Sequence, residues 1–380
     1  MTAFLPDGKF LQKGLLAGMS AVPGIHSAKP KPVDPSLAGK NTLPQSVVPG
    51  PKDRITFKTA ANARGGGEPV SASPLCVGAW PWGDTGTWNW KEDEELPRVR
   101  AAWKYLYESG INFIDTATVY GDGRSEEIVG ELIRDLPRES VVIQTKYLGL
   151  PTAAENYLHP VDAPVRELKK SLARMKIDYV DIYMVHGPVH PQSISNVAKG
   201  LAKIVEEGLA RAVAVANYDA DDLKKMEAAL AEHGVPLAAQ QVEFNVLRRI
   251  PEISGQIAEC RESGIVFQTY SSLAQGRLSG KYSAENPPPK SYRFSSYDMK
   301  DVEPTLKVLR DIAAKRGKSV ASVSLNWVVS KGGLPLVGIR NEQQAKDAVE
   351  ALGWRLTDEE VAEIDRVSFK GHTTKLWQQG

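Results

Sequence analysis

The sequence of 380 residues has little of what marks several large classes of protein. Its two cysteines, Cys76 and Cys260, lie in separate apolar segments without metal-site spacing, which predicts free thiols in a reducing compartment. No apolar run approaches the roughly 20 residues that a membrane helix needs. The formal net charge of +1 provides no basic footprint for nucleic acid or an anionic membrane. With 42% hydrophobic and 24% charged residues, the chain has the composition of a globular protein of enzyme size, and we expect no nucleic-acid or membrane partner.

The first 53 residues differ in composition from the rest of the chain. They are rich in Pro, Ser, Lys and Gly and show little periodicity, which predicts an irregular extension. Three interpretations fit this extension: a disordered tail, a wrap over the following domain, or part of an organelle transit peptide. Its low content of acidic residues is typical of a transit peptide, but its low content of arginine is not. We therefore expect an extension over residues 1–53, one domain over 54–367 and a tail over 368–380, which is a candidate lid. A cytoplasmic location is predicted, with a plastid or another organelle as the alternative.

Short runs rich in β-forming residues alternate with helical spacing from residue 70 onward. Eight candidate strands cover residues 75–80, 111–117, 140–146, 179–186, 211–217, 238–244, 264–271 and 333–339. Several of the segments between them end in glycine, as helices commonly do. One of these segments, SEEIVGELIRDL, begins with Ser125 ahead of acidic residues, so Ser125 is a predicted N-cap.

This alternation predicts parallel strands joined by right-handed crossovers. Eight such units over about 300 residues fit a closed (β/α)8 barrel, the TIM barrel, as a single α/β domain. An open doubly wound sheet is the alternative, but it calls for a glycine-rich dinucleotide turn after the first strand. The first candidate strand is followed by GAWPWGDTGTWNW, which does not match that turn.

In a barrel of this kind the site lies at the carboxyl ends of the strands. Four residues there can take part in proton chemistry, and they follow consecutive candidate strands: Asp115, Tyr120, Lys146 and His186. Singly, each has a plain structural alternative, such as a helix cap for Asp115, a strand-end charge for Lys146 or a satisfied histidine for His186. HGPVH (186–190) is not a metal motif, because Pro188 spoils a helical pair of histidines and no Cys or acidic ligand is close.

Six stretches in the same order resemble motifs of the aldo-keto reductases, which are NADPH-dependent barrel enzymes. They are DTATVYG, YVDIYMVHGP, GLARAVAVANYDADDLKKM, QQVEFNVLRR, YSSLAQGRLSGKY and LPLVGIRNEQQAKDA, and the resemblance runs from about residue 66 to residue 367. The pattern is most similar to the branch that contains potassium-channel β-subunits, pyridoxal reductases and many microbial, fungal and plant oxidoreductases.

The resemblance implies a catalytic role for each of the four residues. Tyr120 is the expected general acid that protonates the carbonyl oxygen, Lys146 and Asp115 tune it, and His186 orients the substrate. The physical chemistry agrees, because a phenol has a pKa near 10 and a neighbouring ammonium stabilises the phenolate. A carboxylate partner keeps a buried lysine charged, and a donor from the histidine stabilises charge on the oxygen as hydride arrives.

The resemblance also implies a binding site for NADPH. Asn217 and Gln241 are expected to bind the nicotinamide carboxamide, Tyr270 to stack on the ring and Arg340 to face the 2′-phosphate. Other expected contacts, along the pyrophosphate and around the adenine, are Ser271, Leu273, Gln275, Gly276, Leu278, Lys281, Gly338, Gln344 and Asp347. Core packing is the alternative for Tyr270, and a solvated helix start is the alternative for Arg340.

Two positions depart from the family pattern on the cofactor side. Ala216 stands where the family usually has a serine, and Ala348 stands where an asparagine is common. A lost hydrogen bond is worth about 0.5–1.5 kcal/mol, so these changes weaken the expected grip on the cofactor without abolishing it.

The predicted function is NADPH-dependent reduction of an aldehyde or ketone to an alcohol, with a small-molecule carbonyl compound as substrate. The alternatives are an NADP(H)-binding regulatory protein with slow turnover, and a non-redox enzyme of secondary metabolism on the same barrel. Trp80, Trp82 and Tyr147 are predicted to line the substrate pocket, and such aromatic lining favours a bulky or planar substrate. The segment WPWGDTGTWNW alternatively forms a stabilising hairpin. The sequence indicates neither the substrate nor the oligomeric state.

Overall fold

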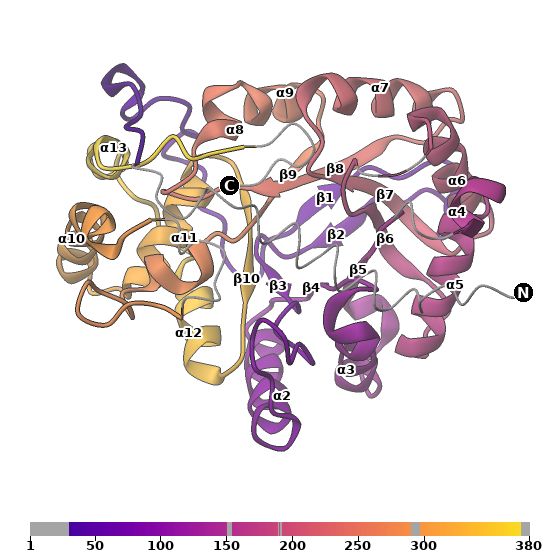
Figure 1. The fold of residues 1–380 in the computed structure, drawn as a ribbon, viewed down its shortest axis with the longest axis horizontal. Coiled ribbons are helices and arrows are strands. Elements are labelled where there is room, and N and C mark those ends of the chain that lie inside the picture. The colour runs from indigo at the N-terminus through magenta and orange to yellow at the C-terminus, as the bar shows by residue number, and fades with distance from the viewer. Residues whose placement is uncertain (1–29, 150–153, 189, 191, 290–296, 374–380) are drawn as a thin grey trace, which may run out of the picture.

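The computed structural model describes residues 30–149, 154–188, 190, 192–289 and 297–373. Eight parallel strands form a closed barrel in the order β10-β3-β4-β5-β6-β7-β8-β9, and Figure 1 shows the helices arranged around them. All eight candidate strands are confirmed, with bounds β3 (Cys76–Gly78), β4 (Phe113–Asp115), β5 (Val142–Tyr147), β6 (Val180–Val185), β7 (Ala210–Ala216), β8 (Leu237–Glu243), β9 (Val266–Tyr270) and β10 (Leu334–Gly338). The predicted (β/α)8 barrel is therefore the observed fold.

Helices follow the barrel strands and cover the outside of the barrel. They are α2 (Glu92–Glu108), α3 (Arg124–Ile133), α4 (Ala154–Leu158), α5 (Ala163–Met175), α6 (Ile194–Glu206), α7 (Ala220–Ala231), α8 (Ile250–Ile253), α9 (Gln256–Glu262), α10 (Met299–Arg316), α11 (Val320–Ser330), α12 (Glu342–Glu350) and α13 (Asp358–Arg366). Helical spacing over 252–264 is interrupted at Gly255, which adopts φ 84° and separates α8 from α9. Among the described residues, none of the helices is both long and apolar enough to cross a lipid bilayer.

The expected N-cap role of Ser125 is wrong. Helix α3 begins after Gly123, whose φ of 95° turns the chain into the helix. Ser125 lies inside the first turn, where its buried hydroxyl donates to the carbonyl of Ala79 at 2.8 Å and lies 2.8 Å from the hydroxyl of Thr116. Because Ala79 and Thr116 follow β3 and β4, Ser125 fixes α3 to the edge of the barrel where the candidate residues lie.

An antiparallel hairpin closes the opposite end of the barrel. It pairs β1 (Ile55–Phe57) with β2 (Val70–Ala72). Phe57 packs edge-on against Phe113 at 5.7 Å between ring centroids, in one apolar cluster with Val142 at the start of β5 and Leu334 at the start of β10. Side chains of this cluster therefore fill the floor of the barrel.

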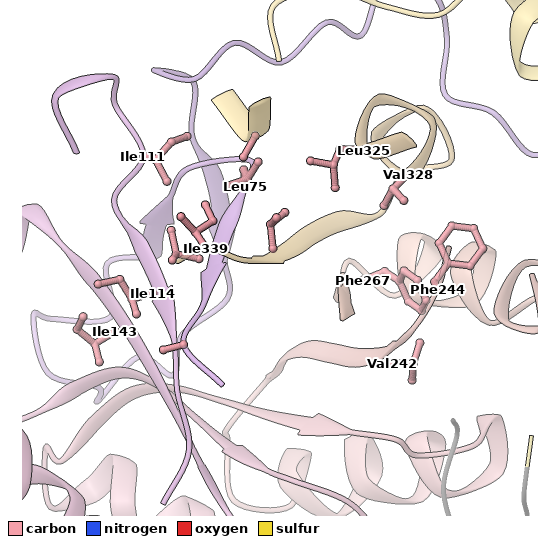
Figure 2. Close-up of a cluster of buried hydrophobic side chains, with 14 of the residues drawn as sticks. Leu75, Ile111, Ile114, Ile143, Val242, Phe244, Phe267, Leu325, Val328 and Ile339 are labelled. Atoms are coloured by element: carbon pink, nitrogen blue, oxygen red, sulfur yellow. The ribbon is translucent and has the colours of Figure 1, made fainter. Parts of the chain in front are cut away.

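The main core lies between the barrel strands and the surrounding helices. Figure 2 shows part of it, including Leu325 and Val328 of α11 and, from the strand side, Leu75 and Ile339. Side chains alternate between this outer core and the barrel interior, because successive residues of a strand point to opposite faces. In β4, for example, Ile114 belongs to the outer core and Phe113 to the interior cluster.

Residues 30–53 wrap over the helices rather than forming a second domain. Leu43 donates its backbone N–H to Ser330 at 2.8 Å, and the N–H of Gly353 bonds to the carbonyl of Pro49 at 2.9 Å. The start of the wrap also pairs with the chain's end, since Pro32 forms a bridge with Phe369. In Figure 1 this indigo segment passes beside α13. The part of the extension before residue 30, and the end of the candidate lid from residue 374, lie outside the described residues.

Buried charges fasten the wrap to the barrel helices. Lys331 is fully buried and bonds to the carbonyl of Lys40 at 2.7 Å, to Asp365 at 2.8 Å and to Glu252 at 3.1 Å. Arg249 completes the group with a bond to Glu252 at 2.7 Å. Asp365 also accepts from the N–H of Gly39 at 2.8 Å. These charges are paired as well as hydrogen-bonded, which is the condition for burying them.

Candidate active site

Strand alternation directs the predicted catalytic residues to the open end of the barrel. Asp115 shares the interior face of β4 with Phe113, and Lys146 shares the interior face of β5 with Val142. His186 follows β6 by one residue, with the same parity as Met184. Tyr120 stands on the turn after β4, at the start of a short 3₁₀ segment, Tyr120–Gly123. The barrel thus brings together four residues that the sequence spreads over about 70 positions.

Lys146 is the centre of this group. Its ammonium donates to Asp115 Oδ2 at 2.6 Å, to the carbonyl of Thr116 at 2.8 Å and to the hydroxyl of Tyr120 at 3.1 Å. An ammonium has three N–H donors, so this set of partners is complete. Burial by itself lowers the pKa of Lys146, but Asp115 and Tyr120 more than offset that effect and raise its pKa above the usual 10.5. Lys146 therefore remains a cation in contact with the phenol oxygen.

His186 faces Tyr120 across the mouth of the barrel. The two rings meet edge to face, with 5.7 Å between centroids and 81° between planes. Burial, with a smaller effect from the charge of Lys146, holds the pKa of His186 well below its usual 6.5. The imidazole is therefore neutral at physiological pH and offers an N–H rather than a second cation. Asn217 fixes the backbone here by donating to the carbonyl of His186 at 2.9 Å.

Three buried glutamines form a network beneath Asp115, and only Gln241 among them was a predicted site residue. Gln144 donates to Asp115 Oδ1 at 2.5 Å, and Gln241 donates to the same oxygen at 3.3 Å. Gln144 and Gln268 exchange two amide hydrogen bonds of 2.9 Å, and Gln241 donates to Gln268 at 2.8 Å. The spacing of these residues in the sequence could have identified the other two glutamines. Gln144 lies two residues before Lys146, and Gln268 lies two residues before Tyr270. Residues at such spacing face the same side of a strand.

A cavity of about 1150 Å³ opens above this group. Most of the predicted site residues line it, namely Trp80, Asp115, Tyr120, His186, Asn217, Gln241, Tyr270, Ser271, Leu273, Gln275, Gly276, Lys281, Gly338, Arg340, Gln344 and Asp347. Lys146 is fully buried and reaches the cavity through Tyr120. Leu278 is in the core instead, with no exposed surface. In the part of the chain that the structure describes, no cluster of three or more His, Cys, Asp or Glu side chains could hold a metal ion.

Of the three predicted substrate-pocket residues, only Trp80 lines the cavity. Its ring is 5.4 Å from that of Trp88 and 6.2 Å from that of Tyr120, which gives one side of the mouth an aromatic wall. Trp82 is 1% exposed and donates its indole N–H to the carbonyl of Ile339 at 2.7 Å. Trp82 lies on a turn after β3, where side chains no longer alternate between the two faces of a strand.

Tyr147 packs away from the cavity. Its hydroxyl donates to Asn156 at 3.1 Å, and burial raises its pKa to about 12. The alternative of a hairpin over 80–90 is also wrong, because this segment contains turns and no strand. Asp84 shapes it by accepting the backbone N–H groups of Gly86 and Thr87, both at 2.8 Å.

The loop after β9 provides a cradle along another side of the cavity. Ser271, Gln275 and Gly276 adopt positive φ values of 52°, 52° and 91°. Such backbone is uncommon for residues other than glycine and is concentrated at functional sites. Tyr270 stands at the start of this loop and donates its hydroxyl to Asn217 Oδ1 at 2.8 Å. The ring of Tyr270, the amides of Asn217 and Gln241, and the curved loop after β9 fit an elongated ligand that has a planar, amide-bearing group at one end.

Arg340 forms an ion pair that was not predicted from the sequence. Its Nε donates to Glu95 Oε2 and its Nη2 donates to Glu95 Oε1, each at 2.6 Å. Glu95 belongs to α2, far from Arg340 in the sequence. The predicted alternative, a solvated side chain at a helix start, does not describe this paired guanidinium.

Comparison with known proteins agrees with this geometry. The family model described as "Aldo/keto reductase family" matches residues 74–368. The chain belongs to the aldo/keto reductase family. Among curated relatives, the chloroplastic pyridoxal reductase of Arabidopsis thaliana is 34% identical over 311 residues, covering 78% of this chain and 83% of the relative. The NADH-specific methylglyoxal reductase of Escherichia coli is 30% identical over 312 residues, covering 76% and 92%.

A solved member of this aldo/keto reductase family has the same barrel. The aldo/keto reductase from Klebsiella pneumoniae, in complex with NADP and acetate, superimposes with a TM-score of 0.63 at 25% identity, covering 85% of this chain and all of that one. The predicted family, barrel fold and oxidoreductase class are therefore confirmed, and NADP as a cofactor is confirmed in a solved relative.

Proposed function

We propose that this aldo/keto reductase reduces an aldehyde or ketone to an alcohol, with NADPH as the hydride donor and Tyr120 as the general acid. The observation that carries the proposal is the contact of the Tyr120 hydroxyl with Lys146 at 3.1 Å, at a cavity where the His186 ring faces that of Tyr120. Tyr120 is the acidic hydroxyl that a carbonyl oxygen meets at the end of the barrel.

Each member of the group has a distinct part in proton transfer. The Lys146 ammonium stabilises the phenolate that Tyr120 becomes when it gives up its proton. Asp115 keeps that ammonium charged, and the donors on Asp115 Oδ1 keep the carboxylate in place. The neutral His186 ring can donate a hydrogen bond to the carbonyl oxygen as negative charge develops on it. Tyr120 alone changes its protonation state in this step, when its proton passes to the carbonyl oxygen.

The residues present fit a nicotinamide cofactor, and NADPH supplies the hydride when it is bound. Asn217 and Gln241 would hold the carboxamide, because amides offer both a donor and an acceptor. Tyr270 would support the ring, and the loop from Ser271 to Lys281 would follow the pyrophosphate. Ala216 is buried and offers no hydroxyl, so this end of the site has one donor fewer than the family pattern.

The aromatic wall of Trp80, Trp88 and Tyr120 favours a planar carbonyl substrate. Flat rings bury much area against such a wall at little cost in conformational entropy. The relative described as a pyridoxal reductase makes pyridoxal the first substrate to test, beside the reactive aldehyde 4-nitrobenzaldehyde. The proposal commits to the class of planar aldehydes and not to one member of it.

The test is NADPH consumption by the purified protein with these aldehydes, in wild type and Tyr120→Phe. The phenylalanine keeps the ring and removes only the proton donor. Turnover in wild type that falls at least about 100-fold in the variant, with NADPH binding retained, supports the role of Tyr120. Tight binding without turnover on either aldehyde would favour the alternatives, a regulatory NADP(H)-binding protein or a non-redox enzyme.

A cytoplasmic location is a separate proposal. The Arabidopsis relative is described as chloroplastic, which keeps a plastid as the alternative. A fluorescent fusion of the full chain, compared with one that lacks residues 1–29, distinguishes the two, because only a transit peptide would make the location depend on those residues.

A further inference from the structure

Glu95 and Arg340 form a partly buried ion pair with a fixed geometry. Both oxygens of one carboxylate meet one edge of the guanidinium, the bidentate geometry that gives the strongest hydrogen bonds of this kind. The Glu95 side chain is 9% exposed and the Arg340 side chain 26% exposed, so neither is a freely moving surface group. Water screens such a pair less than an exposed one.

Each partner is also held by its own element. Glu95 is in the first turn of α2, where it accepts the backbone N–H of Lys91 at 3.2 Å and where the helix dipole favours a carboxylate. Arg340 lies on the turn between β10 and α12, with its backbone N–H bonded to Gln344 at 2.8 Å. The carboxylate is therefore a fixed neighbour of the guanidinium.

The charged residues around the cavity show why this ion pair matters for cofactor binding. Among the described residues that line the cavity, the cationic side chains are Lys281 and Arg340, against the carboxylates Asp84, Asp115, Asp122 and Asp347. NADPH differs from NADH only by a 2′-phosphate, which carries between one and two negative charges. Discrimination between the two cofactors therefore depends on the net charge of the groups around this phosphate. In this protein the cation Arg340 is paired with the carboxylate Glu95.

We propose that Glu95 is a specificity-determining residue that cancels most of the charge of Arg340, so that the protein distinguishes only weakly between NADPH and NADH. The inference rests on the proposed function, since it assumes that Arg340 faces the 2′-phosphate. Glu95 uses two of the five N–H donors of the guanidinium, and the other three can still bind a phosphate. NADPH is accepted, but a phosphate that approaches Arg340 also approaches a carboxylate, and like charges repel.

The test is the ratio of the dissociation constants of NAD⁺ and NADP⁺, measured by calorimetry for wild type and Glu95→Gln. Glutamine keeps the shape and an acceptor oxygen but removes the charge. We expect the preference for NADP⁺ to rise about tenfold in Glu95→Gln while the affinity for NAD⁺ stays constant, which corresponds to about 1.4 kcal/mol. The matched control is Glu94→Gln, an exposed carboxylate of the same helical turn that pairs with Lys91 instead and leaves the ratio unchanged.

A second variant removes the whole pair. In Glu95→Gln/Arg340→Gln, both charges are lost together, so we expect the ratio to stay within about threefold of wild type because the pair supplies little net charge. A tenfold drop in NADP⁺ preference would overturn the inference, since Arg340 would then act as an uncompensated cation. An unchanged or lower NADP⁺ preference in Glu95→Gln would overturn it as well. If neither dinucleotide binds to wild type, the proposed function itself falls.

Discussion

The residue that organises the site is Lys146, because its ammonium contacts both Tyr120, the proposed general acid, and the carboxylate of Asp115. Its environment could be anticipated, since Asp115, Tyr120 and His186 follow neighbouring strands and a barrel gathers the ends of its strands. The partner of Arg340 could not be anticipated, because Glu95 lies 245 positions away and no local pattern encodes such a pairing. The predicted pocket position of Trp82 was wrong because the alternation of side chains does not extend beyond the end of a strand.

The half-buried, neutral His186 predicts a pH dependence of stability. Because its folded-state pKa lies well below 6.5, the unfolded chain takes up a proton below pH 6.5 while the folded chain does not, so stability falls as the pH falls. His186→Gln should remove about 1.4 kcal/mol of the loss in free energy of unfolding between pH 7.5 and pH 5.5. Urea unfolding at the two pH values measures it.

The control for this pH dependence is His233→Gln, which replaces an exposed histidine. It should leave the difference between the two pH values as in wild type. An equal effect of both variants would mean that His186 is protonated in the folded protein.

At the scale of elements, the strands were predictable and the interior glutamine network only in part. Short runs of β-forming residues mark each strand, but the role of a polar residue inside a strand is not evident until its partners on other strands are known. Gln144, Gln241 and Gln268 come from three different strands and satisfy one another only when the barrel closes. Ser125 was misread for a similar reason, since its hydroxyl binds two neighbouring strand ends instead of its own helix.

The network predicts that Gln144 positions Asp115. Gln144→Leu removes a donor from Asp115 Oδ1 and leaves part of the Gln268 amide without its partner, which costs about 1–3 kcal/mol. We expect kcat for aldehyde reduction to fall about tenfold with little change in KM, because the binding surface of the cavity is untouched. Steady-state kinetics of the purified variant checks the split.

Gln240→Leu is the matched control, since Gln240 is a buried strand glutamine that bonds to the carbonyl of Tyr218 outside the network. It should lose stability but keep kcat. A similar loss of kcat in both variants would show that general loosening of the barrel, and not the position of Asp115, limits the rate.

At the scale of the whole molecule, the wrap of residues 30–53 was one of three sequence interpretations. Irregular backbone carries no periodicity, so its docking depends on particular contacts such as that of Lys331 with the carbonyl of Lys40. The eightfold alternation, in contrast, is repeated along most of the chain and predicts the barrel even where single elements are misjudged.

The buried charge cluster predicts how strongly the wrap is held. Lys331→Met leaves Asp365 and Glu252 without one cation in a dry environment, so we expect a loss of about 3–5 kcal/mol in the free energy of unfolding. Urea unfolding monitored by tryptophan fluorescence measures it. Lys315→Met, at an exposed lysine 3.7 Å from Glu360, should cost less than about 1 kcal/mol. A loss in Lys331→Met as small as that of the control would contradict the cluster's role.

The measurement that tests the central claim most directly is the fate of deuterium from NADPH deuterated at both C4 positions, with pyridoxal or 4-nitrobenzaldehyde as acceptor. Mass spectrometry of the alcohol formed by wild type should show one deuterium on the former carbonyl carbon. Tyr120→Phe should bind the cofactor and form at least about 100-fold less of this product. An alcohol without deuterium, or undiminished product from Tyr120→Phe, would contradict a reductase in which Tyr120, set by Lys146 and Asp115, delivers the proton.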